Sequence, residues 1–430
     1  MAESDFDAIV VGSGCAGSVA AYELAKAGKS VLVVERGNHA GAKNMTGGRL
    51  YAHALREVFP DFESEAPVER KISHEKISLM APDSNFTVDF SSDDMLVPGQ
   101  ESYSILRGNF DPWLAEKAEE AGAEYIYGIA VESLMKDGDK VCGIIAGEDE
   151  ITADIVLLCD GVNSLLTPQA VGAARPSAHA VAVGVKQTIE LPADTIQDRA
   201  LAADGEGCAW LFAGSVTDGK VGGGFMYTNK DSVSLGVVST IADVASGDTP
   251  VYQMLENLKN HPAVAPIIRG GKVVEHSGHM VPEGGYDMMP TMIGNGVMLA
   301  GESAMMCINL GYMVRGMDYA IASGMYAGRN AVKALDKGDT SKAGLQSYVD
   351  DLNNSFIMQD FKNFSKFPHF LEGATRVFTE YPLMIRDIFN SMFVVNGKPM
   401  TSVKKTGMAR VKQVGYMNLL KDVRGGMKAL

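Results

Sequence analysis

A glycine-rich turn joins an apolar run to a helix-forming segment at the start of the chain. The three segments are, in order, FDAIVV at 6–11, GSGCAG at 12–17 and SVAAYELAKA at 18–27. Gly12 permits a tight turn, Gly14 lets a phosphate approach the backbone, and Gly17 allows close contact between helix and strand. A second apolar run follows at 30–34, so the order predicts a right-handed strand–helix–strand unit of a parallel sheet.

An acidic residue ends the second predicted strand, about 20 residues after the glycine turn, which is the spacing of Rossmann-like dinucleotide sites. We expect Glu35 to accept hydrogen bonds from both ribose hydroxyls of an adenosine. Its charge would repel a 2′-phosphate, which favours FAD or NAD over NADP. The neighbouring residues Cys15, Ala16 and Arg36 are expected to line the same site.

Charge and cysteine content exclude several other functions. The formal net charge is −15, which makes nucleic acid a poor partner. The five cysteines form no C-x-x-C pair, so we expect neither a zinc site nor an iron–sulfur cluster held by this chain. His276 and His279 lack the further ligands of a metal motif, and no metal is expected. The N-terminus has no signal-peptide pattern and no apolar run is long enough to span a bilayer, which predicts a cytoplasmic protein.

The remaining pattern predicts an α/β fold with three interleaved parts. A discontinuous Rossmann-like domain for the dinucleotide is expected at 1–70, 105–175 and 280–335. A mixed-sheet domain for the substrate is expected at 71–104 and 176–279, and a mainly helical region at 336–430. Residues 36–53 are interpreted as a long glycine-rich loop, and a helix is expected from about 312 to 335.

Three further segments favour FAD. LRGNFDPWL at 106–114 places Arg107 before a helix, IVLLCDGVNS at 155–164 ends a strand with Asp160 and Gly161, and LAGES at 299–303 ends another with Gly301 and Glu302. Here the chain resembles the glutathione-reductase-type flavoproteins, the group with flavin hydroxylases and geranylgeranyl reductases. The resemblance implies that Glu302 binds the ribityl chain of FAD, while Arg107 and Asp160 line its site.

Within this group the chain is most similar to the FixC-type electron-transfer-flavoprotein:quinone oxidoreductases. The resemblance runs almost end to end and rests on GNHAGAKNMTGGRLYAH at 37–53, APVERKISHEKIS at 66–78, FAGSVTDGKVGGGFMYTN at 212–229, HPAVAPIIRGGK at 261–272 and NLGYMVRGMDYAIASG at 309–324. It implies electron transfer from a two-subunit electron-transfer flavoprotein toward quinone. It also implies a small ferredoxin partner carrying a separate iron–sulfur cluster.

The motif at 301–304 departs from the pattern that is usual in this group of flavoproteins. The group usually has Gly-Asp-Ala-Ala where this chain has Gly-Glu-Ser-Ala at 301–304. Glu302 keeps a carboxylate acceptor, but its side chain is one methylene longer than that of the usual aspartate. We therefore expect FAD binding to be retained but weakened. The loop Thr46, Gly47, Gly48 and Arg49 is expected to approach the flavin ring.

The segment after this motif is also assigned to the cofactor. Gly311, Tyr312 and Met313 are expected at the N-terminus of a helix whose dipole points at the flavin pyrimidine edge. Val131, at the end of an expected strand, completes the cofactor-binding set. No catalytic acid or base can be nominated from the sequence.

The C-terminal tail is basic in an otherwise acidic chain. Residues 398–430 contain eight basic side chains and one acid, Asp422. A solvated helix surface is one interpretation. The other is docking onto an acidic ferredoxin or onto an anionic membrane, which would place the protein peripherally on its inner face.

The expected function is therefore FAD-dependent electron transfer from an electron-transfer flavoprotein to quinone or a ferredoxin-like partner. An FAD-dependent ene-reductase or hydroxylase acting on a small molecule remains an alternative, and so does a flavin-poor assembly subunit.

Overall fold

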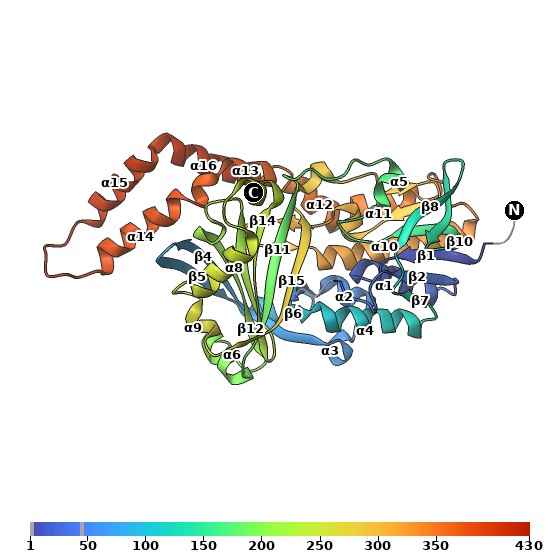
Figure 1. Ribbon diagram of the computed structural model, residues 1–430, viewed down its shortest axis with the longest axis horizontal. Helices are drawn as coiled ribbons and strands as arrows, with labels where there is room; N and C mark the ends of the chain where they lie inside the picture. Colours follow the sequence, from blue (N-terminus) through green and yellow to red (C-terminus); the bar gives the residue numbers. More distant parts are fainter. Residues whose placement is uncertain (1–3, 44–46) are drawn as a thin grey trace.

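A parallel sheet forms around the N-terminal strand in the computed structural model, which describes residues 4–43 and 47–430 (Figure 1). Its order is β16-β17-β10-β1-β2-β7, with the β8–β9 hairpin attached to β10. The strands are β1 (Phe6–Val11), β2 (Val31–Glu35), β7 (Glu124–Tyr127), β8 (Val131–Asp137), β9 (Lys140–Ala146), β10 (Asp149–Leu158), β16 (Ile293–Gly294) and β17 (Val297–Leu299). β1 pairs in parallel with β2 and β10. Burial on both faces explains why β2, most of β1 and the end of β10 are continuous apolar runs.

Helices cover this sheet and pack closely on one another. They are α1 (Cys15–Lys26), α2 (His53–Val58), α3 (Phe62–Glu65), α4 (Arg107–Glu120), α5 (Thr167–Val171), α10 (Met317–Lys337), α11 (Gln346–Asn354) and α12 (Phe356–Asn363). Two glycines of α10 let it approach α1. A Cβ at Gly324 would lie 2.2 Å from the carbonyl oxygen of Ala16, and one at Gly328 would lie 2.8 Å from that of Ala20. The absence of side chains at these two positions therefore lets α10 pack directly against the backbone of α1.

A second, mixed sheet has the order β15-β11-β14-β13-β12-β4-β6-β3, with β5 paired to β4. Its strands are β3 (Gly47–Tyr51), β4 (Val68–Ala81), β5 (Ser84–Ser91), β6 (Ser102–Leu106), β11 (Val181–Glu190), β12 (Glu206–Gly214), β13 (Gly222–Thr228), β14 (Ser232–Thr240) and β15 (Lys272–Pro282). Its helices are α6 (Ala193–Ala200), α7 (Ile241–Ser246), α8 (Val251–Asn260) and α9 (Ala265–Ile268). Leu255 and Leu258 of α8 bury one face of this sheet.

The C-terminal region is helical and part of it projects from the body (Figure 1). Its helices are α13 (Phe367–Gly373), α14 (Glu380–Phe393), α15 (Val403–Val414) and α16 (Tyr416–Ala429). We call α14–α16 the C-terminal arm. The guanidinium of Arg376 donates to both carboxylate oxygens of Asp422 at 2.7 and 2.6 Å, and the Tyr381 hydroxyl donates to the same carboxylate. The single acid of the basic tail therefore anchors α16.

The predicted fold class is confirmed, but two local expectations were wrong. The segment expected to be one long loop at 36–53 contains strand β3, which pairs with β6. The helix expected from about 312 begins at Met317, because Ile308–Asn309 and Val314–Arg315 pair first as the short hairpin β18–β19. The dipole of α10 therefore does not begin at Gly311.

Candidate functional site

A cavity of about 820 Å³ lies where the parallel sheet, the mixed sheet and the C-terminal helices meet. Segments far apart in the sequence line it, and most of the residues assigned to the cofactor are among them. These are Gly12, Gly14, Cys15, Ala16, Glu35, Arg36, Gly48, Arg49, Arg107, Val131, Asp160, Gly161, Gly301, Glu302, Gly311 and Tyr312. Such a volume is in the range of small-molecule and cofactor sites.

The glycine turn shapes one end of the cavity. Gly12 has φ +96°, and a Cβ there would lie 2.5 Å from the carbonyl oxygen of Cys159. A Cβ at Gly17 would lie 1.9 Å from the carbonyl oxygen of Gly12, so Gly17 serves helix–strand packing. Gly14 is the N-cap residue of α1 and supplies no side-chain hydrogen bond. The first turn of α1 therefore faces the cavity without a side-chain cap, as a phosphate-binding helix requires.

The carboxylate of Glu35 lies beside this turn at the end of β2. Its Oε2 accepts hydrogen bonds from the backbone nitrogen of Ser13 at 2.9 Å and from the Ser13 hydroxyl at 3.2 Å. Its Oε1 accepts from the backbone nitrogen of Gly37 at 2.6 Å. These bonds fix the carboxylate at the cavity wall.

Arg107 reaches the same end from the first turn of α4. Its Nε and Nη2 donate to the two carboxylate oxygens of Asp111 at 2.5 and 2.6 Å. Asp111 is fully buried, and the Sγ of Cys15 lies 3.8 Å from its Oδ1. Burial raises the pKa of Asp111, and the charge of Arg107 opposes that rise. Asp111 thus holds the guanidinium at the cavity and was not predicted from the sequence.

The Asp-Gly motif and the last motif are joined by Ser303. The Ser303 hydroxyl donates to Oδ1 of Asp160 at 2.9 Å and accepts from the backbone nitrogen of Gly161, also at 2.9 Å. Burial raises the pKa of Asp160, and hydrogen bonds from Ser164 and Ser303 lower it. Ser303 stands where the family pattern has alanine, so this departure adds two hydrogen bonds behind the cavity.

Glu302 faces a histidine of the mixed sheet. Its Oε2 lies 3.5 Å from Nε2 of His279, and both residues line the cavity. His279, which has no assigned role from its sequence context, is therefore part of the site. Among the residues that the structure describes, no group of three or more His, Cys, Asp or Glu side chains could hold a metal ion.

Three other residues assigned to the cofactor, Arg49, Gly47 and Met313, form contacts within the protein itself. Arg49 forms an ion pair with Glu75 and donates from Nε to the Ser102 hydroxyl at 2.9 Å. Gly47 pairs with Leu106 in the mixed sheet. Met313 is not one of the residues that line the cavity. The backbone carbonyl of Met313 accepts a hydrogen bond from the backbone nitrogen of Leu310. Thr46, which precedes the loop glycines, lies outside the described residues.

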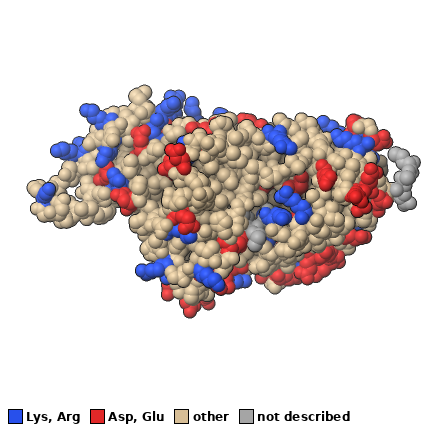
Figure 2. All heavy atoms as spheres, in the orientation of Figure 1, with Lys and Arg blue, Asp and Glu red and all other residues tan. Residues whose placement is uncertain are grey.

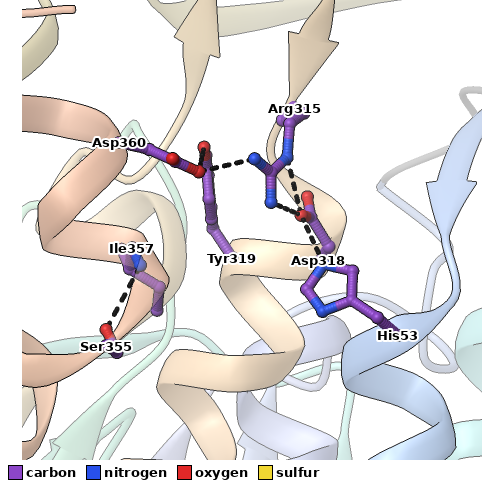
Figure 3. Close-up of polar contacts among 7 residues, drawn as sticks. All are labelled: His53, Arg315, Asp318, Tyr319, Ser355, Ile357 and Asp360. Carbon is purple, nitrogen blue, oxygen red and sulfur yellow. Dashed lines mark hydrogen bonds and ion pairs between the residues drawn. The ribbon is translucent and has the colours of Figure 1, made fainter. Parts of the chain in front are cut away.

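A partly buried ionic cluster fixes the β18–β19 hairpin next to the cavity (Figure 3). Arg315 donates from Nε and Nη2 to Oδ2 of Asp318 at 2.9 and 2.6 Å, and from Nη1 to Oδ2 of Asp360 at 2.5 Å. His53 lies 3.2 Å from the same oxygen of Asp318, and the Tyr319 hydroxyl donates to Asp360 at 2.9 Å. We call these five residues the Arg315 cluster. It joins α2, the hairpin, α10 and α12, so it holds the chain that lines the cavity at 310–316.

A carboxyl group with an unusual environment lies near this hairpin. The Asn309 amide nitrogen lies 3.3 Å from both carboxylate oxygens of Glu283, and Asn309 Oδ1 accepts from the backbone nitrogen of Gly311 at 2.9 Å. Burial raises the pKa of Glu283 to about 7, and the hydrogen bond from Asn309 opposes that rise. No sequence motif includes Glu283, and only the fold brings it to the cavity.

The opposite part of the cavity is apolar. Side chains of the mixed sheet and of the C-terminal helices form it, and the last residue of the chain contributes as well. They include Leu211, Phe212, Phe225, Val238, Phe367, Phe370, Leu371, Phe378, Ile385 and Leu430. One continuous cavity therefore joins a polar, glycine-rich end to an apolar end.

Comparison with known proteins identifies the class and then the family. A family model described as an FAD binding domain matches residues 5–200. Fold and site thus define an FAD-binding flavoprotein. A second model, the ETF-QO/FixC family C-terminal domain, matches residues 367–430. The chain is 49% identical to the probable electron transfer flavoprotein-quinone oxidoreductase YdiS of Escherichia coli K12 and 47% identical to Protein FixC of Salmonella typhi, each over 100% of both chains. The chain belongs to the ETF-QO/FixC family.

Solved structures show the same fold at low identity. A geranylgeranyl bacteriochlorophyll reductase-like protein from Thermoplasma acidophilum aligns with a TM-score of 0.70 at 18% identity, over 98% of this chain and 99% of that one. The flavin-dependent brominase Bmp2 aligns with a TM-score of 0.64 at 15% identity, over 95% and 98% of the two chains. Because flavoproteins of different activities share this fold, the fold alone does not assign a substrate.

Proposed function

We propose that the protein accepts electrons from a two-subunit electron-transfer flavoprotein and passes them to a quinone through one FAD held in the cavity. The observation that supports this most is the continuity of the cavity. It extends from the glycine turn before α1 to the apolar wall formed by the C-terminal helices. The names of the full-length relatives support the same donor and acceptor.

The cavity's residues fit FAD from one end to the other. The first turn of α1 and the guanidinium of Arg107 would bind the pyrophosphate, and Glu35 would accept the ribose hydroxyls. Asp160 and Glu302 would bind the ribityl chain, and the backbone around Gly311 would border the ring system. A Cβ at Gly161 would meet no atom within 4 Å, so the backbone there stands open to a ligand. When bound, FAD supplies the redox chemistry, and the chain supplies binding, orientation and exclusion of water.

A quinone suits the apolar end. Its ring is flat and its tail is apolar, and both require a wall of aromatic and aliphatic side chains with few polar groups. Phe367, Phe370 and Phe378 provide such a wall beside Gly311. The Cζ of Phe367 lies 3.9 Å from the Cβ position of Gly311, so an apolar ligand at this wall would lie next to the proposed ring site.

A small ferredoxin with its own iron–sulfur cluster is the proposed further partner. The five cysteines are free, and four of them are buried. Burial raises the pKa of the Cys208 thiol to about 12, which disfavours the thiolate needed for cluster ligation. A cluster needed for onward electron transfer would therefore have to be held by a separate protein.

The C-terminal arm is the proposed contact with the inner face of an anionic membrane. Figure 2 shows Lys and Arg side chains gathered over the projecting arm. Large apolar side chains stand among them, with Phe393 71% exposed, Val395 80% exposed and Met417 76% exposed. Apolar and basic groups together bind anionic lipid surfaces. Among the described residues, the helices are too short or too polar to cross a bilayer.

Anaerobic stopped-flow spectroscopy tests the proposed function. The flavin-loaded protein should lose its oxidised flavin absorbance on mixing with reduced electron-transfer flavoprotein, and a quinone should restore it. Rapid bleaching by NADH or NADPH alone would instead support the ene-reductase or hydroxylase alternative. Protein that holds no flavin after incubation with FAD would support the assembly-subunit alternative.

A further inference from the structure

Alternate residues of β15 and of the chain just after it face the cavity. Ser277, His279, Val281 and Glu283 all line it, as the two-residue period of a strand requires. This edge of the mixed sheet therefore presents two titratable side chains, His279 and Glu283, to the cavity. His279 is paired with Glu302, whereas Glu283, which lines the same cavity, is not part of that pair.

The surroundings of Glu283 place it beside the proposed quinone. Its backbone nitrogen donates to the carbonyl of Ala180 at 2.8 Å, and its carboxyl accepts from Asn309, which also holds Gly311. A Cβ at Gly285 would lie 3.0 Å from Pro368, so α13 packs against the same turn. The carboxyl thus contacts Asn309 of the hairpin that borders the proposed ring site, and the turn after Glu283 packs against α13, which contributes Phe367, Phe370 and Leu371 to the cavity wall.

Few charged groups face this carboxyl. Burial raises the pKa of the Cys307 thiol, which lies just before β18, and the negative charges of Glu302, Glu283 and Asp318 raise it further. From α13 the cavity receives Phe367, Phe370 and Leu371, whereas His369 of that helix pairs with Asp287 at the surface. The carboxyl of Glu283 is hydrogen-bonded to the neutral Asn309 amide, and burial outweighs this bond and raises the pKa of Glu283 to about 7.

We propose that Glu283 is the proton donor to the bound quinone, an inference that rests on the proposed function. Reduction of a quinone to a quinol adds two electrons and two protons, one proton to each oxygen. The electron pair arrives from the donor flavoprotein by way of FAD. The O–H bond of Glu283 breaks as a new O–H bond forms on one quinone oxygen. Solvent hydronium supplies the other proton and afterwards restores that of Glu283.

The test is single-turnover reoxidation of the reduced, full-length flavoprotein by a short-tailed quinone, in the parent and in Glu283→Gln. At about pH 6 the variant should react about 100-fold more slowly, which is in the range of a lost general acid. The parent's rate should fall as the pH rises through about 7, because the ionised carboxylate cannot donate, whereas the variant's rate should not. Flavin content and reduction by the donor flavoprotein should be unchanged.

Two further variants complete the design. Glu283→Asp keeps a carboxyl and should retain the pH dependence. Asp287→Asn removes a carboxylate four residues away that is 65% exposed at its side chain, and it should behave as the parent. A Glu283→Gln variant with the parent's rate and pH profile would overturn the inference. A parent protein that reduces no quinone would overturn the proposed function itself.

Thermal unfolding gives a readout that does not depend on turnover. A carboxyl whose folded pKa is raised above its unfolded value stabilises the fold at low pH, and this contribution is lost as the pH rises toward the folded pKa. The melting temperature of the flavin-loaded parent should therefore fall relative to Glu283→Gln between about pH 5 and about pH 8. A difference independent of pH would contradict the protonation on which the inference depends.

Discussion

Arg107 and Asp111 form a bidentate ion pair one turn apart at the beginning of α4, with Nε and Nη2 2.5 and 2.6 Å from separate carboxylate oxygens. Asp111 is fully buried, whereas Arg107 borders the cavity. The pair therefore gives a cavity-facing guanidinium a fixed orientation from behind. Any anionic group bound at the glycine turn would meet this prepositioned cation.

The variant Asp111→Asn should lose both stability and flavin. Removing one partner of a buried ion pair costs about 3–5 kcal/mol, because the remaining charge is left uncompensated. Chemical denaturation and the flavin absorbance of the purified protein measure the two effects. Glu120→Gln on the same helix removes an exposed pair with Lys117 and should cost less than about 1 kcal/mol. Equal effects of the two variants would contradict this role for Asp111.

Replacing Ser303 by alanine should destabilise the protein by about 1–3 kcal/mol, because Asp160 loses a donor and the Gly161 nitrogen loses an acceptor. Denaturant unfolding of the flavin-free and flavin-loaded forms measures the effect. Flavin binding should weaken as well, since both partners line the cavity. Unchanged stability would show that these two hydrogen bonds are dispensable.

Arg315→Lys should keep the fold but loosen the hairpin that borders the cavity. Lysine keeps the charge but cannot donate to Asp318 and Asp360 from a planar group, nor stack on Tyr319, whose ring centroid lies 4.4 Å from the guanidinium carbon. We expect weaker FAD binding in an equilibrium titration. Arg329→Lys on α10 replaces a guanidinium that is 39% exposed and should bind FAD as the parent does. The reverse ranking would contradict the role of the Arg315 cluster.

Substitutions of Glu302 separate its charge from its length. Glu302→Ala removes the carboxylate and should lower flavin affinity by about tenfold or more, the size of one lost charge-assisted hydrogen bond. Glu302→Asp restores the residue usual in the group and should bind FAD at least as tightly as the parent. Fluorescence titration of flavin-free protein measures both. Full affinity in Glu302→Ala would remove this residue from the proposed site.

The C-terminal arm should bind anionic vesicles in a salt-dependent way. Replacing Lys404 and Lys405 by glutamine should weaken binding by about 30-fold, at about 1 kcal/mol for each charge. Co-sedimentation with anionic and neutral vesicles measures this. The matched control replaces Lys26 and Lys337, exposed residues at the ends of α1 and α10, and should have no effect. Equal loss in both double variants, or binding insensitive to salt, would contradict docking through the arm.

The sequence predicted the parts of the site that depend on local spacing. Gly12, Gly14 and Glu35 belong to one strand–helix–strand unit, whose geometry follows from chain direction and glycine placement. It also predicted the α/β fold class. These features depend only on residues that lie close together in the sequence.

The contacts between distant segments were not predictable in the same way. Ser303 meets Asp160, and His279 meets Glu302, because strands remote in sequence align in register, and periodicity does not encode that register. The prediction of a helix from about 312 was wrong for a related reason. Its first residues pair as a hairpin with Gly311 at φ +73°, a tertiary arrangement that overrides local helix propensity.

The position of FAD in the cavity can be determined from a crystal structure of the flavin-loaded protein. It should show a single FAD with its adenosine at Glu35, its pyrophosphate at Gly12–Gly14 and Arg107, and its ring system beside Gly311. An isoalloxazine bound elsewhere, or a cavity closed by its own side chains in protein saturated with FAD, would contradict the account.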